Sequence, residues 1–143
     1  MSKLEFYTDG AYSFTRETGG VGVVVVKDGE KVYEFSKTYP KYSNNRCELL
    51  AVIHSLNAIS KPVESIVIYT DSQYVIGGAT LGWKRKANVD LWNLYDKYYT
   101  KASEFCKDIT FSWIKGHSKG STKDEQFNNL ADTLAVSASH KIS

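Results

Sequence analysis

The first strand-like stretch of the chain alternates between two sets of side chains. Residues 4–10 carry different residue types at odd and even positions, the period of two expected for a strand with two different faces. Gly10 is expected to turn the backbone directly after Asp9, which would hold this carboxylate at the tip of a rigid element. The alternative is that Asp9 only opens an ordinary Asp-Gly turn.

A predicted hairpin follows this strand. Residues 11–20 are polar and flanked by glycine, which favours a loop. Residues 21–26 are rich in valine and predict a buried strand. A turn at residues 27–30 joins it to another strand over residues 31–39, which Pro40 ends.

The hydrophobic spacing changes to a helical period between residues 44 and 59. The apolar positions on one face of this predicted helix are Leu49, Val52, Ile53, Leu56 and Ile59. Asn44 or Asn45 can cap its start, and Glu48 lies in its first turn. Taken alone, Glu48 is better explained as the capping-box partner of Asn45 than as a functional acid.

The next short β-branched run, residues 63–69, predicts a strand that ends just before Asp71. A strand, a helix and another strand imply a right-handed crossover, so this strand lies parallel to its partner. If that partner is the first strand, Asp9 and Asp71 leave the same end of the sheet side by side, where open α/β sheets bind ligands. The alternative for Asp71 is an N-cap of a short helix over residues 72–80.

The second half of the chain predicts a helix over residues 89–107, a strand over residues 109–113 and a last helix over residues 124–139. Before them, the basic run from Trp83 to Lys86 is either a solvated face or a contact for a nucleic-acid backbone. Asp132 lies near the border of the buried face of the last helix. An acid there is either solvated or directed at a site.

The loop over residues 115–125 places His117 between two glycines. A histidine in such an open loop is free to move and to exchange protons near neutral pH. The alternative is an incidental surface residue, because loops carry both functional and neutral positions.

The composition of the chain limits which class of protein it can be. The 143 residues are 42% hydrophobic and 24% charged, which is ordinary for a globular protein and predicts one domain over residues 1–143. The net charge of +2 is too small to argue for nucleic acid by itself. Cys47 and Cys106 have no motif around them and are expected to be reduced core thiols. No signal peptide or long apolar span appears, which predicts a cytoplasmic protein that binds no membrane.

Four acids therefore stand apart from ordinary surface charges: Asp9, Glu48, Asp71 and Asp132. Gathering carboxylates without basic partners is unfavourable unless cations compensate. Oxygen ligands without a local His or Cys cluster point to Mg²⁺, with Mn²⁺ as a substitute. Two such ions about 3.5–4 Å apart can stabilise the attacking and leaving oxygens of a phosphodiester displacement. The four acids thus predict a hydrolytic nuclease site.

The chain resembles type 1 ribonuclease H from Lys3 to about Ala138. Five motifs occur in the order and spacing of that family: Tyr7-Thr8-Asp9-Gly10, Asn44-Asn45-Arg46-Cys47-Glu48-Leu49, Tyr69-Thr70-Asp71-Ser72-Gln73-Tyr74-Val75, Trp113-Ile114-Lys115-Gly116-His117-Ser118 and Asn129-Leu130-Ala131-Asp132. The resemblance implies an α/β fold of the ribonuclease H type. Its mixed five-stranded sheet begins with three antiparallel strands, continues with parallel strands and is flanked by helices.

The resemblance also implies a function. It implies an endonuclease that cuts the RNA strand of RNA/DNA hybrids by two-metal-ion catalysis and leaves 3′-hydroxyl and 5′-phosphate ends. The implied metal ligands are Asp9, Glu48, Asp71 and Asp132, and the implied catalytic set adds His117, which would assist proton transfer or product release. A monomer is expected.

The family likeness further assigns substrate contacts. Asn44, Asn45 and Gln73 resemble positions that contact the 2′-hydroxyls displayed in the minor groove of the hybrid. Lys41, Ser43 and Asn88 fall where the family forms a pocket for a DNA phosphate. Tyr74 and Trp83 fall where side chains pack against deoxyribose. Contacts to sugar and backbone do not select a base sequence.

The chain departs from the family at two places. The lysine-rich protrusion of many bacterial members is shortened here to residues 81–87, and Thr15 stands where the family often has asparagine. Two other functions are compatible with the same fold: a hybrid-binding module without activity, and a different nuclease or strand-transferase. The complete acid set argues against the first. Gln73, the Asn44-Asn45 positions and the His117 loop argue against the second.

Overall fold

The structure is a computed structural model that describes residues 2–116 and 119–141. It contains a five-stranded sheet in the order β3-β2-β1-β4-β5. The elements in chain order are β1 (Lys3–Ser13), β2 (Thr18–Lys27), β3 (Glu30–Pro40), α1 (Asn44–Asn57), β4 (Ser65–Thr70), α2 (Gln73–Thr80), α3 (Val89–Ser103), β5 (Ile109–Trp113) and α4 (Lys123–Ser139).

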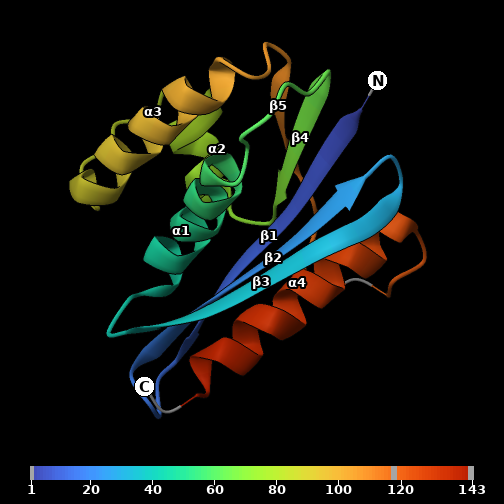
Figure 1. The fold of residues 1–143 in the computed structure, drawn as a ribbon. Helices are drawn as coiled ribbons and strands as arrows, with labels where there is room; N and C mark the ends of the chain where they lie inside the picture. Colours follow the sequence, from blue (N-terminus) through green and yellow to red (C-terminus); the bar gives the residue numbers. More distant parts are fainter. Residues whose placement is uncertain (1, 117–118, 142–143) are drawn as a thin grey trace.

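The direction of the strands confirms the mixed sheet. β1, β2 and β3 pair antiparallel in sequence, whereas β4 pairs parallel with both β1 and β5. Figure 1 shows α4 along one side of the β1–β3 part of the sheet and the helices α1, α2 and α3 grouped on the other. None of the helices in the described part of the chain is both long and apolar enough to cross a membrane.

Strand β2 is buried on both faces, which explains its run of valines. Val21, Val23 and Val25 belong to the larger core cluster, together with residues of α1 and α3. Val24 and Val26 face the other way and join Ala131 of α4 in a second cluster. Because side chains of a strand alternate between the two faces, consecutive valines serve both layers. Cys47 and Cys106 are free and buried, as predicted for core thiols.

The predicted turn at Gly10 is wrong. β1 continues through Gly10 to Ser13, and Gly10 pairs with Val21 of β2. Most of the predicted loop over residues 11–20 is therefore strand, with only residues 14–17 forming the turn. The glycines of this region follow from packing, since Gly20 lies against the backbone of Ala135 and Ser139 in α4.

The helix caps also differ from the prediction. Ser43, and neither Asn44 nor Asn45, caps α1, because its side chain accepts a hydrogen bond from the Arg46 backbone N–H. Ser72 caps α2 in the same way, so Asp71 has no capping role. The alternatives of a capping function for Glu48 and Asp71 are thereby excluded.

Several element ends shift slightly, including both ends of β3 (Glu30–Pro40) and of β4 (Ser65–Thr70). α1 stops at Asn57 and α3 at Ser103, short of the predicted ends at residues 59 and 107. α4 begins at Lys123, one residue before the prediction, because Thr122 and Glu125 form a capping box.

The contact between β2 and α4 depends on a glycine. A Cβ at Gly22 would lie 2.7 Å from the backbone nitrogen of Ala135 and would also press on the carbonyl oxygen of Ala131. We expect Gly22→Ala to lower the free energy of unfolding by about 1–3 kcal/mol, because overpacking forces α4 away from the sheet. Urea unfolding measures this change in the free energy of unfolding. Val136→Ala, at a half-exposed position of α4, is the control. Equal stability of the two variants would contradict the role of Gly22.

Candidate active site

The parallel pairing of β1 and β4 brings two of the predicted acids to one place. The register pairs Tyr7 with Tyr69, so the positions two residues further along are Asp9 and Asp71. β4 ends at Thr70, whereas β1 continues and stays paired with β2 only. Asp71 thus follows a strand end as predicted, and Asp9 projects from the interior of a strand at the point where its neighbour leaves.

Glu48 reaches Asp9 because α1 begins directly against β1. A Cβ on Gly10 would lie 2.6 Å from the carbonyl carbon of Cys47 and would collide with the backbone nitrogen of Glu48. Only glycine permits this approach. The Gly10 N–H donates to Oε1 of Glu48 and, at 2.9 Å, to Oδ1 of Asp9. One backbone donor therefore orients two of the acids.

Three carboxylates form a compact cluster. One oxygen from each of Asp9, Glu48 and Asp71 lies within 4.8 Å of the other two. Asp9 is 4% exposed and Glu48 is 5% exposed. No ion pair among the described residues neutralises these three acids. The cluster is therefore a buried concentration of negative charge.

Asp132 extends this cluster from α4 on the opposite side of the sheet. Its side chain hydrogen-bonds to Asp9, and its negative charge acts on the same carboxyl. All four predicted acids are thus brought together: two by neighbouring strands, one by α1 and one by α4.

Burial is the main reason why the acids of the cluster resist ionisation. It raises the pKa of Asp9 far above the ordinary value, and the charge of Asp71 raises it further. Burial also raises the pKa of Glu48, and the charges of Asp9 and Asp71 add to the effect. Both groups therefore hold their protons to a higher pH than an ordinary carboxyl does, unless a cation offsets the charge.

The cluster has the properties of a metal site. Oδ1 of Asp71 is buried and has no hydrogen-bond donor among the described residues, although such an atom is normally paired. Carboxylate oxygens are the ligands that Mg²⁺ and Mn²⁺ prefer. A divalent cation would pair this oxygen and offset the mutual repulsion of the carboxylates. The residues present therefore fit a divalent cation.

The loop that carries His117 approaches the same cluster. A Cβ on Gly116 would lie against the Asp71 carboxylate, 3.4 Å from its Cγ. Trp113 at the end of β5 donates from Nε1 to the Asp71 carbonyl oxygen at 3.1 Å. His117 itself lies outside the described residues.

The predicted substrate contacts surround the acids in two groups. Lys41, Ser43, Asn44 and Asn45 are exposed at or before the N-terminus of α1, and Gln73 is exposed at the first position of α2. The second group consists of Tyr74 in α2, Trp83 in the connection from α2 to α3, and Asn88 directly before α3.

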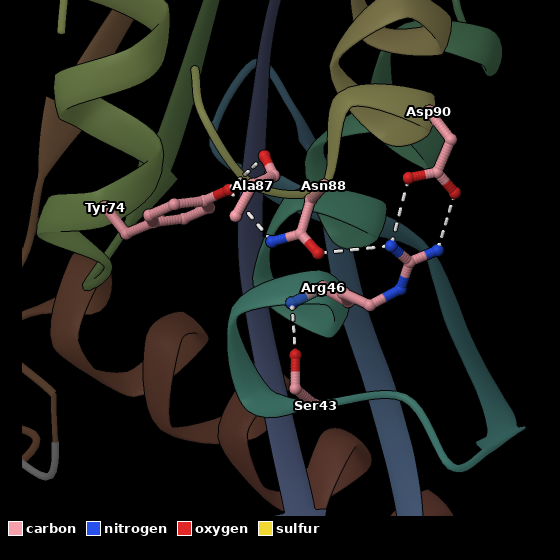
Figure 2. Close-up of polar contacts among 6 residues, drawn as sticks. All are labelled: Ser43, Arg46, Tyr74, Ala87, Asn88 and Asp90. Carbon is pink, nitrogen blue, oxygen red and sulfur yellow. Dashed lines mark hydrogen bonds and ion pairs between the residues drawn. The ribbon is translucent and has the colours of Figure 1, made fainter. Parts of the chain in front are cut away.

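Asn88 is held by Tyr74, a predicted substrate contact, and by Arg46, which the sequence did not single out. It adopts a left-handed φ of 57° directly before α3. Its Oδ1 accepts from Arg46, and its Nδ2 donates to the Tyr74 hydroxyl at 2.9 Å. Figure 2 shows Arg46 between Asn88 and Asp90, with its guanidinium forked on the Asp90 carboxylate. The only sequence signal for this pair is that Arg46 lies inside one of the five motifs.

The basic run after α2 divides into two parts. Lys84 and Lys86 are exposed. Arg85 donates to both oxygens of Asp96 at 2.8 Å, and its guanidinium lies over the Trp92 ring at 4.4 Å. Arg85 is therefore a structural residue, which corrects the reading of the whole run as a nucleic-acid contact. Trp83 is 52% exposed, and its ring packs on Gly77.

The fold and the site define an α/β protein with a candidate divalent-cation site, to which one strand, one strand end and two helices contribute acids. Comparison with known proteins assigns this chain to a family. The family model RNase H matches residues 1–140. Ribonuclease H of Trichodesmium erythraeum is 36% identical, over 99% of this chain and 91% of its own length. The chain belongs to the RNase H family.

Solved structures show the same fold. RNase H1 from the halophilic archaeon Halobacterium salinarum has a TM-score of 0.73 at 26% identity, covering 95% of this chain and 96% of the other. LC11-RNase H1, solved in complex with an RNA/DNA hybrid, has a TM-score of 0.75 at 21% identity, with 94% and 95% covered. At 21% identity, the likeness to LC11-RNase H1 shows a shared fold only.

The raised pKa values predict how metal and pH affect stability. The unfolded chain ionises its carboxyls near pH 4, whereas the folded cluster holds protons to a higher pH. Without metal, this contribution to stability is therefore complete below about pH 4 and is lost as the pH rises through the raised folded pKa. We expect Mg²⁺ to raise the Tm, by roughly 3 °C at saturating concentration, and more at pH 8 than at pH 5.

Asp9→Asn provides the matched control for this experiment. It removes one buried charge and keeps an acceptor for the Gly10 N–H. We expect it to raise the Tm of the metal-free protein at pH 8 and to abolish the Mg²⁺-dependent shift. Thermal unfolding followed by circular dichroism measures both effects. An equal Mg²⁺ shift in the variant and the parent protein would show that the cluster binds no cation.

Proposed function

We propose that this protein is an endonuclease that hydrolyses the RNA strand of RNA/DNA hybrids by two-metal-ion catalysis, leaving 3′-hydroxyl and 5′-phosphate ends. The observation that carries the proposal is the convergence of buried, unneutralised carboxylates in a chain of the RNase H family. Membership of the RNase H family favours the RNA/DNA hybrid as substrate, and LC11-RNase H1, which shares the fold, is solved with such a hybrid.

Asp9, Glu48, Asp71 and Asp132 would hold the cations. When bound, two Mg²⁺ or Mn²⁺ ions would lower the pKa of the attacking water and would stabilise negative charge on the attacking and leaving oxygens. The protein orients its own carboxylates in advance, because the Gly10 N–H fixes Asp9 and Glu48. The burial of these two acids keeps bulk water from screening the interaction.

We assign recognition of the hybrid to polar groups near the acids. Asn44, Asn45 and Gln73 are exposed beside the cluster and offer amide donors and acceptors to 2′-hydroxyls. In a wide and shallow minor groove, such contacts separate an RNA strand from a DNA strand. They do not read base edges, so cleavage is expected at many sequences.

The DNA strand would be held by the groups around Arg46. Asn88 has two Nδ2 hydrogens, and the Tyr74 hydroxyl takes only one of them. The other is available to a phosphate oxygen, together with Lys41 and the Ser43 hydroxyl. The fork of Arg46 on Asp90 keeps the Asn88 amide in place. Tyr74 and Trp83 border one small hollow, where a deoxyribose can pack without a 2′-hydroxyl.

Cleavage of a labelled hybrid tests the proposal. With Mg²⁺, we expect the protein to cut the RNA strand of an RNA/DNA hybrid and to leave RNA/RNA and DNA/DNA duplexes intact. Asp9→Asn and Asp71→Asn should each reduce the rate roughly a hundredfold or more, because each removes a charge that holds a cation. Chelation of all divalent metal should stop the reaction. Full activity of either variant, or activity with the metal chelated, would refute the mechanism.

His117→Ala addresses proton transfer separately from binding. We propose that His117 exchanges a proton with the reacting groups or assists product release, since its loop approaches Asp71 through Gly116. Turnover should fall by about tenfold or more, while the Kd for the hybrid stays nearly unchanged. Single-turnover rates and fluorescence anisotropy separate the two quantities. A large loss of affinity would mean that this loop positions the substrate instead.

A further inference from the structure

The turn between β1 and β2 presents an aromatic side chain to solvent. Phe14 is 88% exposed, and its ring meets that of Tyr12 edge-to-face with centroids 5.0 Å apart. A single exposed apolar residue is common and has no meaning by itself. Here two aromatic rings support each other on one surface, and the residues opposite them are polar.

This turn is held in one conformation. The Ser13 hydroxyl accepts from the Arg16 backbone N–H at 3.3 Å, and the Thr18 hydroxyl donates to the Arg16 carbonyl at 2.9 Å. The Lys41 backbone N–H donates to the carbonyl of Glu17 at 2.8 Å. The turn is thereby tied to the segment that leads into α1, and the position of Phe14 relative to Lys41 is set by the backbone.

A hollow of about 440 Å³ lies between these two segments. Its lining residues are Tyr12, Phe14, Lys41, Ser43 and Asn44. One wall is aromatic, and the other carries an ammonium, a hydroxyl and an amide at the N-terminus of α1, where the helix dipole adds positive charge. The hollow thus combines an apolar surface with groups that attract a phosphate.

We infer that Phe14 and Tyr12 are a further substrate contact: they pack against the sugar of the nucleotide whose phosphate the proposed function places at Lys41 and Ser43. The inference rests on the proposed function. It adds an aromatic contact, from the turn between β1 and β2, to the substrate surface. The charge complementarity and the continuity with Asn44 favour nucleic acid as the occupant. A nucleotide matches both walls, because it has an anionic and an apolar part.

The test compares Phe14→Ala with Tyr33→Ala. Tyr33 is also an exposed aromatic residue, 57% accessible, near the opposite end of β3 from Lys41. We expect Phe14→Ala to raise the Kd for the hybrid and the KM roughly fivefold or more, with kcat unchanged. Phe14→Trp should restore binding, and Tyr33→Ala should behave like the parent protein. Circular dichroism and Tm should show that the variants are folded.

Salt dependence distinguishes the aromatic wall from the basic one. Lys41→Ala should lower the slope of log K against log salt by about one, whereas Phe14→Ala should leave the slope unchanged because the ring carries no charge. Equal hybrid affinity of Phe14→Ala and the parent protein would overturn the inference, as would a fall in kcat at constant KM. Absence of cleavage by the parent protein would refute the proposed function instead, because the anisotropy comparison needs no cleavage.

Discussion

The contact between the start of α1 and Gly10 of β1 is the constraint on which the candidate site depends. The helix approaches so closely that a Cβ at Gly10 would meet the backbone of Cys47 and Glu48. This approach lets one N–H serve two carboxylates. It also sets the position of Ser43 and Asn44, which border both the acids and the hollow beside Phe14. A larger residue at Gly10 would move the whole first turn of α1 and disturb all of these groups together.

The cluster of acids is unfavourable for the metal-free fold, and the surrounding structure keeps it from being neutralised internally. Arg46, two positions before Glu48 in the chain, is paired with Asp90 of α3. Its charge is therefore not drawn toward Asp9 or Glu48. Buried carboxylates of this kind favour proton or metal binding over ionisation in isolation. A site that binds cations is thus less stable when empty, and stability and function are linked through the same charges.

Much of the fold follows from local patterns. The valines of β2 and the helical spacing of α1 predict these two elements. The crossover predicts that β4 lies parallel to its partner, which makes Asp9 and Asp71 neighbours if that partner is β1. The mixed five-stranded sheet as a whole was implied by the resemblance to ribonuclease H. The predicted turn at Gly10 and the caps assigned to Asn44 and Asn45 are wrong, because each depends on what packs against the residue. The single domain over residues 1–143, the monomeric state and the cytoplasmic location stay predictions.

The sequence by itself determined the kinds of residue available: acids next to strand ends or on amphipathic helices, with no histidine or cysteine cluster to compete for a metal. It also determined the approximate positions of most strands and helices, because hydrophobic periodicity is a local property. Only the tertiary structure decided that Glu48 and Asp132 face Asp9, that Arg46 orients Asn88 and that Phe14 faces Lys41. These residue pairs are far apart in the chain, and their approach depends on how closely helices and turns pack, which no local pattern encodes.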